Sequence, residues 1–165
     1  MADIDPVVSI AMDHARIAIH DAPTKPGFEL VPARRTSDDE WELLASPLYA
    51  MGVAAGDRIR ALDNTGGFEI LARGGNVCVQ LYLDEGASAD STRQVADALA
   101  RDLAPLGGRV DGLTPGLISF TIPVSGGLAA IEAAFAAAEA RYAVAQWQYF
   151  NGYDLVTGEP LGWWV

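Results

Sequence analysis

Residues 76–83 read Asn76-Val77-Cys78-Val79-Gln80-Leu81-Tyr82-Leu83, and this alternating stretch opens the part of the chain that decides the fold. A period of two predicts a β-strand whose faces differ in character. One face carries Val77, Val79, Leu81 and Leu83, and the other carries Cys78, Gln80 and Tyr82.

Two amphipathic helices are predicted after this strand. The first is capped by Ser88, has Asp90 in its first turn and runs to about Leu106. The second begins after Ser125. Their buried stripes, at helical spacing, are Val95, Leu99, Leu103 and Leu106 in the first, and Leu128, Ile131, Phe135, Ala138 and Tyr142 in the second.

Three further strands complete this half of the chain. They are predicted at residues 109–111, 117–122 and 146–150, and Pro123 ends the second of them. The order of elements over residues 76–150 is therefore β-α-β-β-α-β. That order is typical of a ferredoxin-like unit.

Residues 27–75 predict a smaller antiparallel unit. Residues 28–33 are strand-like, 40–45 alternate in part, 58–62 alternate cleanly, and 68–73 run back as a hairpin partner, with turns between these runs. Pro32 suggests an edge strand or a strand end. Short strands joined by such turns favour a curled or SH3-like sheet. The predicted fold is thus α+β, with a curled or SH3-like unit followed by a ferredoxin-like unit.

The two ends of the chain are predicted as a lead-in and a tail. Residues 1–26 form the lead-in, and a strand near Ile17 to His20 is expected to join the first sheet. Residues 151–165 form the tail, which ends in Trp163-Trp164-Val165. We expect these tryptophans to pack back against the chain's own core, because exposed tryptophan is unfavourable in water. The alternative is that they contact another chain.

The charge balance constrains the partners. The chain of 165 residues carries 22 acidic and 11 basic side chains, for a formal net charge of −11. Both residues 1–75 and residues 76–165 contribute to the excess, so the negative field is spread over the molecule. Such a field disfavours nucleic acid and anionic lipid surfaces and attracts a basic protein. It also suits a role in solubility alone.

Cysteine content and the N-terminus bear on the compartment. Cys78 is the only cysteine, which excludes an internal disulfide. Residues 1–6 are acidic and lack the pattern of a signal peptide. No apolar run approaches the roughly 20 residues that span a bilayer. These features predict a cytoplasmic protein.

A turn motif lies between the predicted strands of the smaller unit. It reads Pro47-Leu48-Tyr49-Ala50-x-Gly52-x-x-x-Gly56-Asp57. Gly52 and Gly56 permit backbone angles closed to other residues, and Asp57 can accept hydrogen bonds from turn amides. With the elements around it, the motif resembles the bacterial domain-of-unknown-function family 4265 over about residues 27–150. The resemblance implies a fold class and a bacterial origin, and no chemistry.

The sequence offers weak candidates for chemistry. Cys78 sits in mid-strand, where an inert buried thiol is expected. His14 and His20 lie near Asp13 and Asp21, but not at a ligand spacing that metal sites use. The segment Arg73-Gly74-Gly75-Asn76 is expected to be a linker, with anion binding as the alternative. No enzyme activity, cofactor or metal is predicted.

The favoured function is protein binding. A small acidic protein without a reaction centre suits an immunity protein that neutralises a basic toxin domain, as in toxin-antitoxin pairs. The candidate contacts are Asp38, Asp39, Glu40, Asp84, Glu85, Trp163 and Trp164. The alternative is a small-ligand sensor, in which a homodimer would bury the open face of the second sheet.

Overall fold

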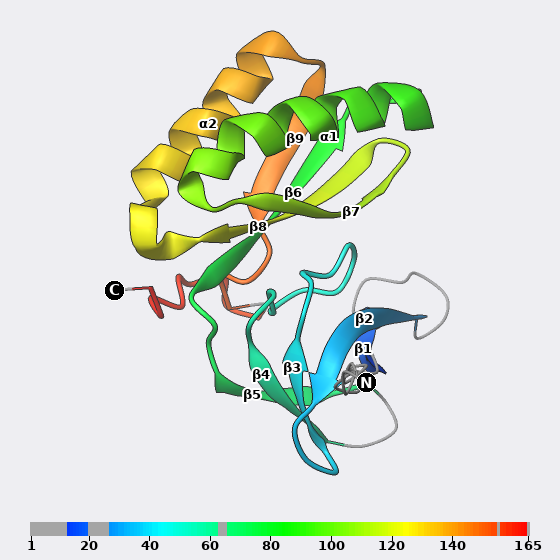
Figure 1. The fold of residues 1–165 in the computed structure, drawn as a ribbon, viewed down its shortest axis with the longest axis vertical. Coiled ribbons are helices and arrows are strands. Elements are labelled where there is room, and N and C mark those ends of the chain that lie inside the picture. The colour runs from blue at the N-terminus through cyan, green and yellow to red at the C-terminus, as the bar shows by residue number, and fades with distance from the viewer. Residues whose placement is uncertain (1–12, 20–26, 63–65, 155, 165) are drawn as a thin grey trace, which may run out of the picture.

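The computed structural model describes residues 13–19, 27–62, 66–154 and 156–164. Within them the chain forms two antiparallel sheets and two α-helices, which confirms the predicted α+β class. The first sheet has the strand order β1-β2-β3-β4-β5, and the second has the order β7-β8-β6-β9. Figure 1 shows one sheet above the other, with both helices on the side of the second sheet that faces away from the first.

The first sheet is a meander, because each strand pairs with the next one in the chain. Its strands are β1 (Asp13–Ile19), β2 (Gly27–Arg35), β3 (Glu40–Leu43), β4 (Arg58–Ala61) and β5 (Phe68–Ala72). The strand expected near Ile17 starts at Asp13 and pairs with β2, while His20 and residues 1–12 lie outside the described residues. Ile17, Val31, Leu43 and Ile59 are buried on one face of the sheet.

Pro32 lies inside β2, whereas the sequence suggested a sheet edge or a strand end. The structure accommodates it because the pairing of β2 with β3 runs only from Arg35 to Ala33. Just beyond the last pair, the N–H of Leu44 donates to the carbonyl of Pro32 at 2.8 Å. The N–H that proline lacks would have returned this bond, so its loss falls where β3 has already ended.

The second sheet carries the two helices. Its elements follow the order β6 (Asn76–Leu83), α1 (Ala89–Leu103), β7 (Arg109–Thr114), β8 (Leu117–Pro123), α2 (Leu128–Arg141) and β9 (Val144–Tyr149), with short 3-10 turns at Ala104–Leu106 and Val124–Gly126. This is the β-α-β-β-α-β order expected from the sequence. Ser88 caps α1 in a capping box with Ser91, where the Ser91 N–H donates to the Ser88 hydroxyl at 3.0 Å.

The larger core lies between the helices and the second sheet. Val95, Leu99 and Leu103 of α1 are buried, as the spacing predicts. Aromatic rings continue the layer, since Phe135 of α2 packs edge-on against Phe120 at 5.3 Å and stacks on Trp147 at 5.1 Å. Burial of these side chains supplies the main stabilising free energy of this half.

Residues 44–57, which we call the bridging loop, join β3 to β4 and reach the second sheet. Figure 1 shows the loop rising from the first sheet toward the second. The Gly52 N–H donates to the Phe150 carbonyl, just past β9, at 2.8 Å. Neither described helix is long and apolar enough to cross a membrane.

Candidate functional site

The bridging loop covers the polar face of β6. The Pro47 carbonyl accepts hydrogen bonds from Gln80 Nε2 at 3.1 Å and from Ser119 Oγ at 2.8 Å, and the Cys78 thiol points at it from 3.7 Å. Gln80 and Cys78 are fully buried as a result. The part of the sheet face on which a second chain was expected to pair is thus occupied by the chain itself.

A second polar group ties the same loop to the edge of the second sheet. Asp111 of β7 accepts from the Ser46 N–H at 2.6 Å, and it also accepts from the Thr121 hydroxyl. Arg109 Nε donates to the other carboxylate oxygen of Asp111 at 2.7 Å. The side chain of Asp111 is almost completely buried, so these partners replace the water that it loses.

Asp57 closes the base of the bridging loop. Its carboxylate accepts from the N–H groups of Ala54 at 3.0 Å and Gly74 at 2.9 Å, which confirms the predicted bonding of turn amides. Burial raises the pKa of Asp57, while those two amides and the Arg73 guanidinium at 3.1 Å oppose the rise. The backbones of Gly74 and Gly56 are in contact here. The residues that we expected to form a linker therefore make a close crossing with another segment of the same chain.

The C-terminal tail lies against the chain itself. Trp163 packs beside the large core, and its indole N–H donates to the Asn151 carbonyl at 2.8 Å. The Arg73 guanidinium sits 5.5 Å from the Trp163 ring centre, and Trp164 packs edge-on against Trp163. Both predicted contact tryptophans are therefore half-buried on their own chain.

A hollow opens between this tail and the end of the first sheet, and we call it the tail hollow. Its volume is 360 Å³. The wall from the first sheet and the bridging loop consists of Gly52, Leu62, Gly67, Phe68 and Arg73, and the wall from the tail consists of Tyr153, Asp154, Val156 and Leu161. The side chains of Leu62 and Val156 are 60% and 93% exposed, which is unusual for aliphatic residues on one surface.

Two charged side chains line the tail hollow, and they differ in how they are held. Arg73 is held by the Gly52 carbonyl at 2.8 Å and by Asp57, so its guanidinium is already engaged. Asp154 accepts from the N–H groups of Val156 and Thr157, and these bonds lower the pKa of its carboxyl group. Asp154 therefore carries a negative charge into the hollow at neutral pH.

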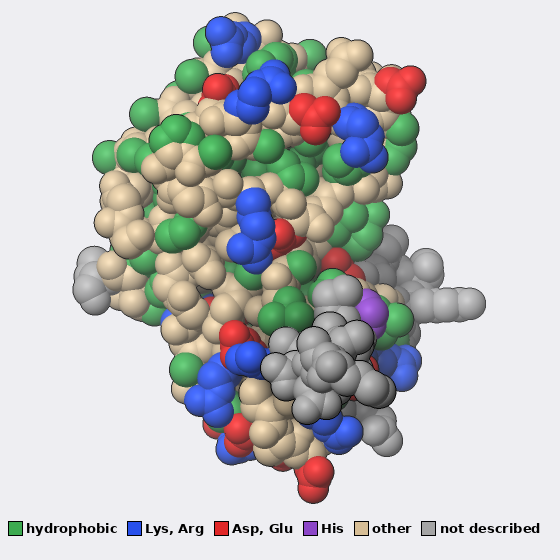
Figure 2. Space-filling model, viewed as in Figure 1, with side chains coloured by type: hydrophobic (Ala, Val, Ile, Leu, Met, Phe, Trp, Pro, Cys, Tyr) green, Lys and Arg blue, Asp and Glu red, His purple; other side chains and the backbone are tan. Residues whose placement is uncertain are grey.

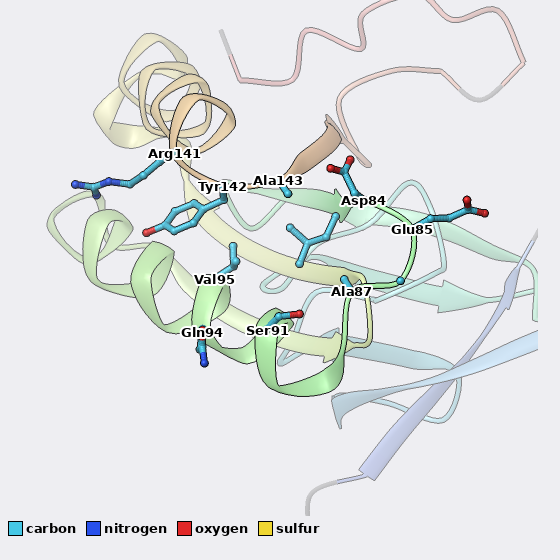
Figure 3. Close-up of a pocket in the computed structure, with 11 residues that line it drawn as sticks. Asp84, Glu85, Ala87, Ser91, Gln94, Val95, Arg141, Tyr142 and Ala143 are labelled. Atoms are coloured by element: carbon cyan, nitrogen blue, oxygen red, sulfur yellow. The ribbon is translucent and has the colours of Figure 1, made fainter.

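A second cleft of 470 Å³ lies at the opposite end of the second sheet, between the start of α1 and the end of α2 (Figure 3). Leu83, Val95 and Tyr142 contribute apolar surface, and Ser91 and Gln94 contribute polar groups. In Figure 3 the charged ends of Arg141 and Glu85 point away from the middle of the cleft. The lining is therefore largely apolar, with charges at the rim.

The predicted acidic contacts do not come together in one site. Asp38 and Asp39 are exposed in the turn between β2 and β3, and Asp84 and Glu85 are exposed in the loop between β6 and α1. Glu40 of β3 is paired with Arg60 at 2.8 Å and with Arg58 at 3.3 Å. Figure 2 shows Arg side chains interspersed with acidic ones over the lower part of the molecule, around the first sheet. Arginine side chains thus partly neutralise the acidic turn, which the net charge of the whole chain did not reveal.

The reactive groups considered from the sequence are arranged for structure. Cys78 is fully buried, and burial raises the pKa of its thiol to about 12. His14 is exposed on β1, and His20 lies outside the described residues. Over residues 13–19, 27–62, 66–154 and 156–164, no group of three or more His, Cys, Asp or Glu side chains could hold a metal ion.

The tail hollow has no direct signature in the amino-acid sequence. Leu62 follows an alternating strand, Val156 follows Leu155 between polar residues, and Leu161 lies between Pro160 and Gly162. Only their convergence in space makes them a surface. The available signal was the run of aliphatic and aromatic residues from Tyr153 to Trp164, in a segment with no strand or helix period to bury them.

Comparisons with known proteins agree with this architecture. A solved structure described as "Novel crystal structure of a hypothetical protein from Neisseria gonorrhoeae" is similar to the chain, with 14% identity and a TM-score of 0.61. The match covers 84% of this chain and 94% of that one, and it supports the fold alone. The search of curated proteins finds no match. A family model described as "Domain of unknown function (DUF4265)" matches residues 29–147, well over half of the chain. The resemblance seen in the turn motif is confirmed, and the chain belongs to this DUF4265 family.

Proposed function

We propose that the protein is a non-enzymatic protein-binding protein that engages its partner through the tail hollow. The observation that carries the proposal is a gathering of exposed apolar side chains. Six large hydrophobic residues of the described chain are exposed, and four of them line this hollow: Leu62, Tyr153, Val156 and Leu161. A contiguous apolar surface with a polar rim is typical of a protein interaction site.

The net charge of −11 supports a basic partner. Opposite charge accelerates encounter, and like charge suppresses association with other acidic proteins. A cationic toxin domain neutralised by this protein in the cytoplasm fits these properties, so an immunity function is the concrete form of the proposal. The exposed acids Asp38, Asp39, Asp84 and Glu85 contribute to the field around the molecule without forming the contact surface.

We also propose a finer description of the scaffold. The strand order β7-β8-β6-β9 with two helices on one face suits a ferredoxin-like unit, and the five-stranded meander suits a curled, SH3-like unit. In this description the tail hollow lies between the β4–β5 hairpin of the SH3-like unit and the tail that follows the ferredoxin-like unit. Solution of an experimental structure at atomic detail tests the assignment through strand order and barrel closure.

Co-expression with the product of an adjacent, growth-inhibiting gene tests the function. We expect growth to be restored and the two proteins to co-purify, with an association rate that falls as salt increases. The variant D38N/D39N should slow association several-fold. The variant D97N/D102N removes the same amount of charge from α1. It is the control that shows whether the location of the charge on the surface matters. The proposal would be contradicted if growth were not restored and no neighbouring gene product formed a complex with the protein.

A second candidate function is the binding of a small ligand. The cleft between α1 and α2 favours it, because its 470 Å³ lies within the range of about 300–1,000 Å³ typical of ligand pockets. A thermal-shift screen of metabolites tests this function. A hit should lose its effect in the variant A143W, which fills the cleft from an exposed position, and keep it in L62D, which alters the distant hollow.

A further inference from the structure

The strand β5 has a main-chain edge that no described strand covers. It is the last strand of the first sheet and pairs only with β4. The register aligns Phe68 with Ala61, Glu69 with Arg60 and Ile70 with Ile59. The Leu62 N–H donates to the Gly67 carbonyl at 3.0 Å, so the main-chain groups of Gly67 and Glu69 face β4, and the register shifts beyond Ile70.

It follows that Phe68 and Ile70 present their N–H and C=O groups to the other side of β5. Among the described main-chain groups none bonds to them. An edge of this kind is a ready template for an additional strand. Figure 1 shows β5 at the lower rim of the molecule, with the linker to β6 rising from its end.

The tail hollow lies along the same strand. Phe68 is the first residue of β5 and Arg73 follows its last residue, and both line the hollow. A strand added to β5 would place alternate side chains beside Phe68, about 5 Å away across the pair. Because Phe68 lines the hollow, such side chains would reach it at this end of β5. The free edge and the apolar surface therefore belong to one feature.

The acidic groups around this feature specify the charge of the occupant. Asp154 lines the hollow, and Glu159 is exposed on the tail turn. Glu69 of β5 is half-exposed and only loosely paired with Arg60, at 3.5 Å. The cations beside this feature are already paired, Arg73 with Asp57 and Arg60 with Glu40. A second copy of this acidic chain is disfavoured for the same reason.

We propose that the tail hollow and the β5 edge together bind an extended segment of a basic protein, which adds to the first sheet as a strand and buries an apolar side chain between Leu62, Phe68 and Val156. The main-chain bonds would supply affinity, and the hollow and its acidic rim would select the sequence. The inference rests on the proposed protein-binding function and names its surface and the chemistry of its partner.

The probe for this inference is a synthetic nine-residue peptide in which lysine alternates with valine and the central valine is leucine. We expect binding to the full chain to be measurable by fluorescence anisotropy, and we expect exchange protection of the Phe68 and Ile70 amides on binding. L62D and V156D should each weaken binding at least tenfold. L30D is the matched control, because Leu30 is 64% exposed but does not line the hollow, and it should change binding less than twofold.

Two modified peptides separate strand addition from simple charge attraction. N-methylation of alternate residues removes the donors on one edge of an added strand, so one methylation pattern should abolish binding and the shifted pattern should retain it. A glutamate version of the peptide should not bind. Equal loss with both patterns, equal effects of L62D and L30D, or no binding at about 1 mM peptide would overturn the inference.

The outcome is separable from that of the proposed function. If the partner found by co-expression binds L62D and V156D as well as it binds the unaltered protein, the proposed surface is wrong and the protein-binding function still stands. Thermal melts of each variant show whether it is folded, and the edge test with modified peptides uses the unaltered chain.

Discussion

At the scale of single residues, Cys78 shows how a potentially reactive group is made inert. It lies on the polar face of β6, and it is fully buried beneath the bridging loop. The pKa of the thiol is raised to about 12 by burial, so the thiolate is scarce until the pH is far above neutral. The alternating pattern predicted the burial. It did not predict the Pro47 carbonyl, because a contact between residues 31 positions apart leaves no local trace in the sequence.

The consequence for Cys78 is measurable with thiol reagents. At pH 8 the native protein should react with iodoacetamide far more slowly than the protein in denaturant, because both the low thiolate fraction and the covering loop oppose attack. Mass spectrometry of the labelled protein gives the rate. Rapid, complete labelling of native protein at that pH would show that the bridging loop opens freely.

At the scale of elements, the decisive contact is the crossing of the bridging loop with the residues after β5. A Cβ on Gly74 would lie 2.3 Å from the carbonyl carbon of Gly56, which is backbone and cannot move aside. Replacement of Gly74 by alanine should therefore lower the free energy of unfolding by about 3 kcal/mol. Gly126→Ala is the control, because the nearest atom to its new Cβ would be Leu106 Cδ2 at 3.9 Å. Urea denaturation of both variants should show a large loss only at Gly74.

Elements with a clear period were the ones that the sequence could predict. The spacing of Val95, Leu99 and Leu103 located α1, and Ser88 marked its start. The bridging loop and the tail have no such period, since their residues are fixed by hydrogen bonds to distant strands. The candidate contact surface was missed for the same reason: Leu62 and Val156 are far apart in the chain and meet only in the folded molecule.

At the scale of the whole molecule, Asp111 couples the two sheets. It holds the Ser46 N–H and the Thr121 hydroxyl at the seam. In the variant D111A the Ser46 N–H would lose its partner, and the Thr121 hydroxyl would keep only its bond with the Ser46 hydroxyl. We expect the loss of about 2–4 kcal/mol in the free energy of unfolding. D102A on the exposed face of α1 serves as the control and should change stability little.

The same variant should change how the molecule opens. With the seam weakened, amides of β3 and β4 should exchange with deuterium well before those of β6 and β8, whose larger core remains intact. Hydrogen exchange measured by mass spectrometry distinguishes the two sheets. Uniform exchange across both sheets in D111A would mean that the seam carries little of the coupling.

The tail hollow has walls of two different origins. Leu62, Phe68 and Arg73 lie within residues 29–147, which match the family, whereas Tyr153, Val156 and Leu161 lie after them. Under the proposed binding function, exchange of the segment from Tyr153 to Leu161 should therefore redirect selectivity while the strand registers of the scaffold stay intact.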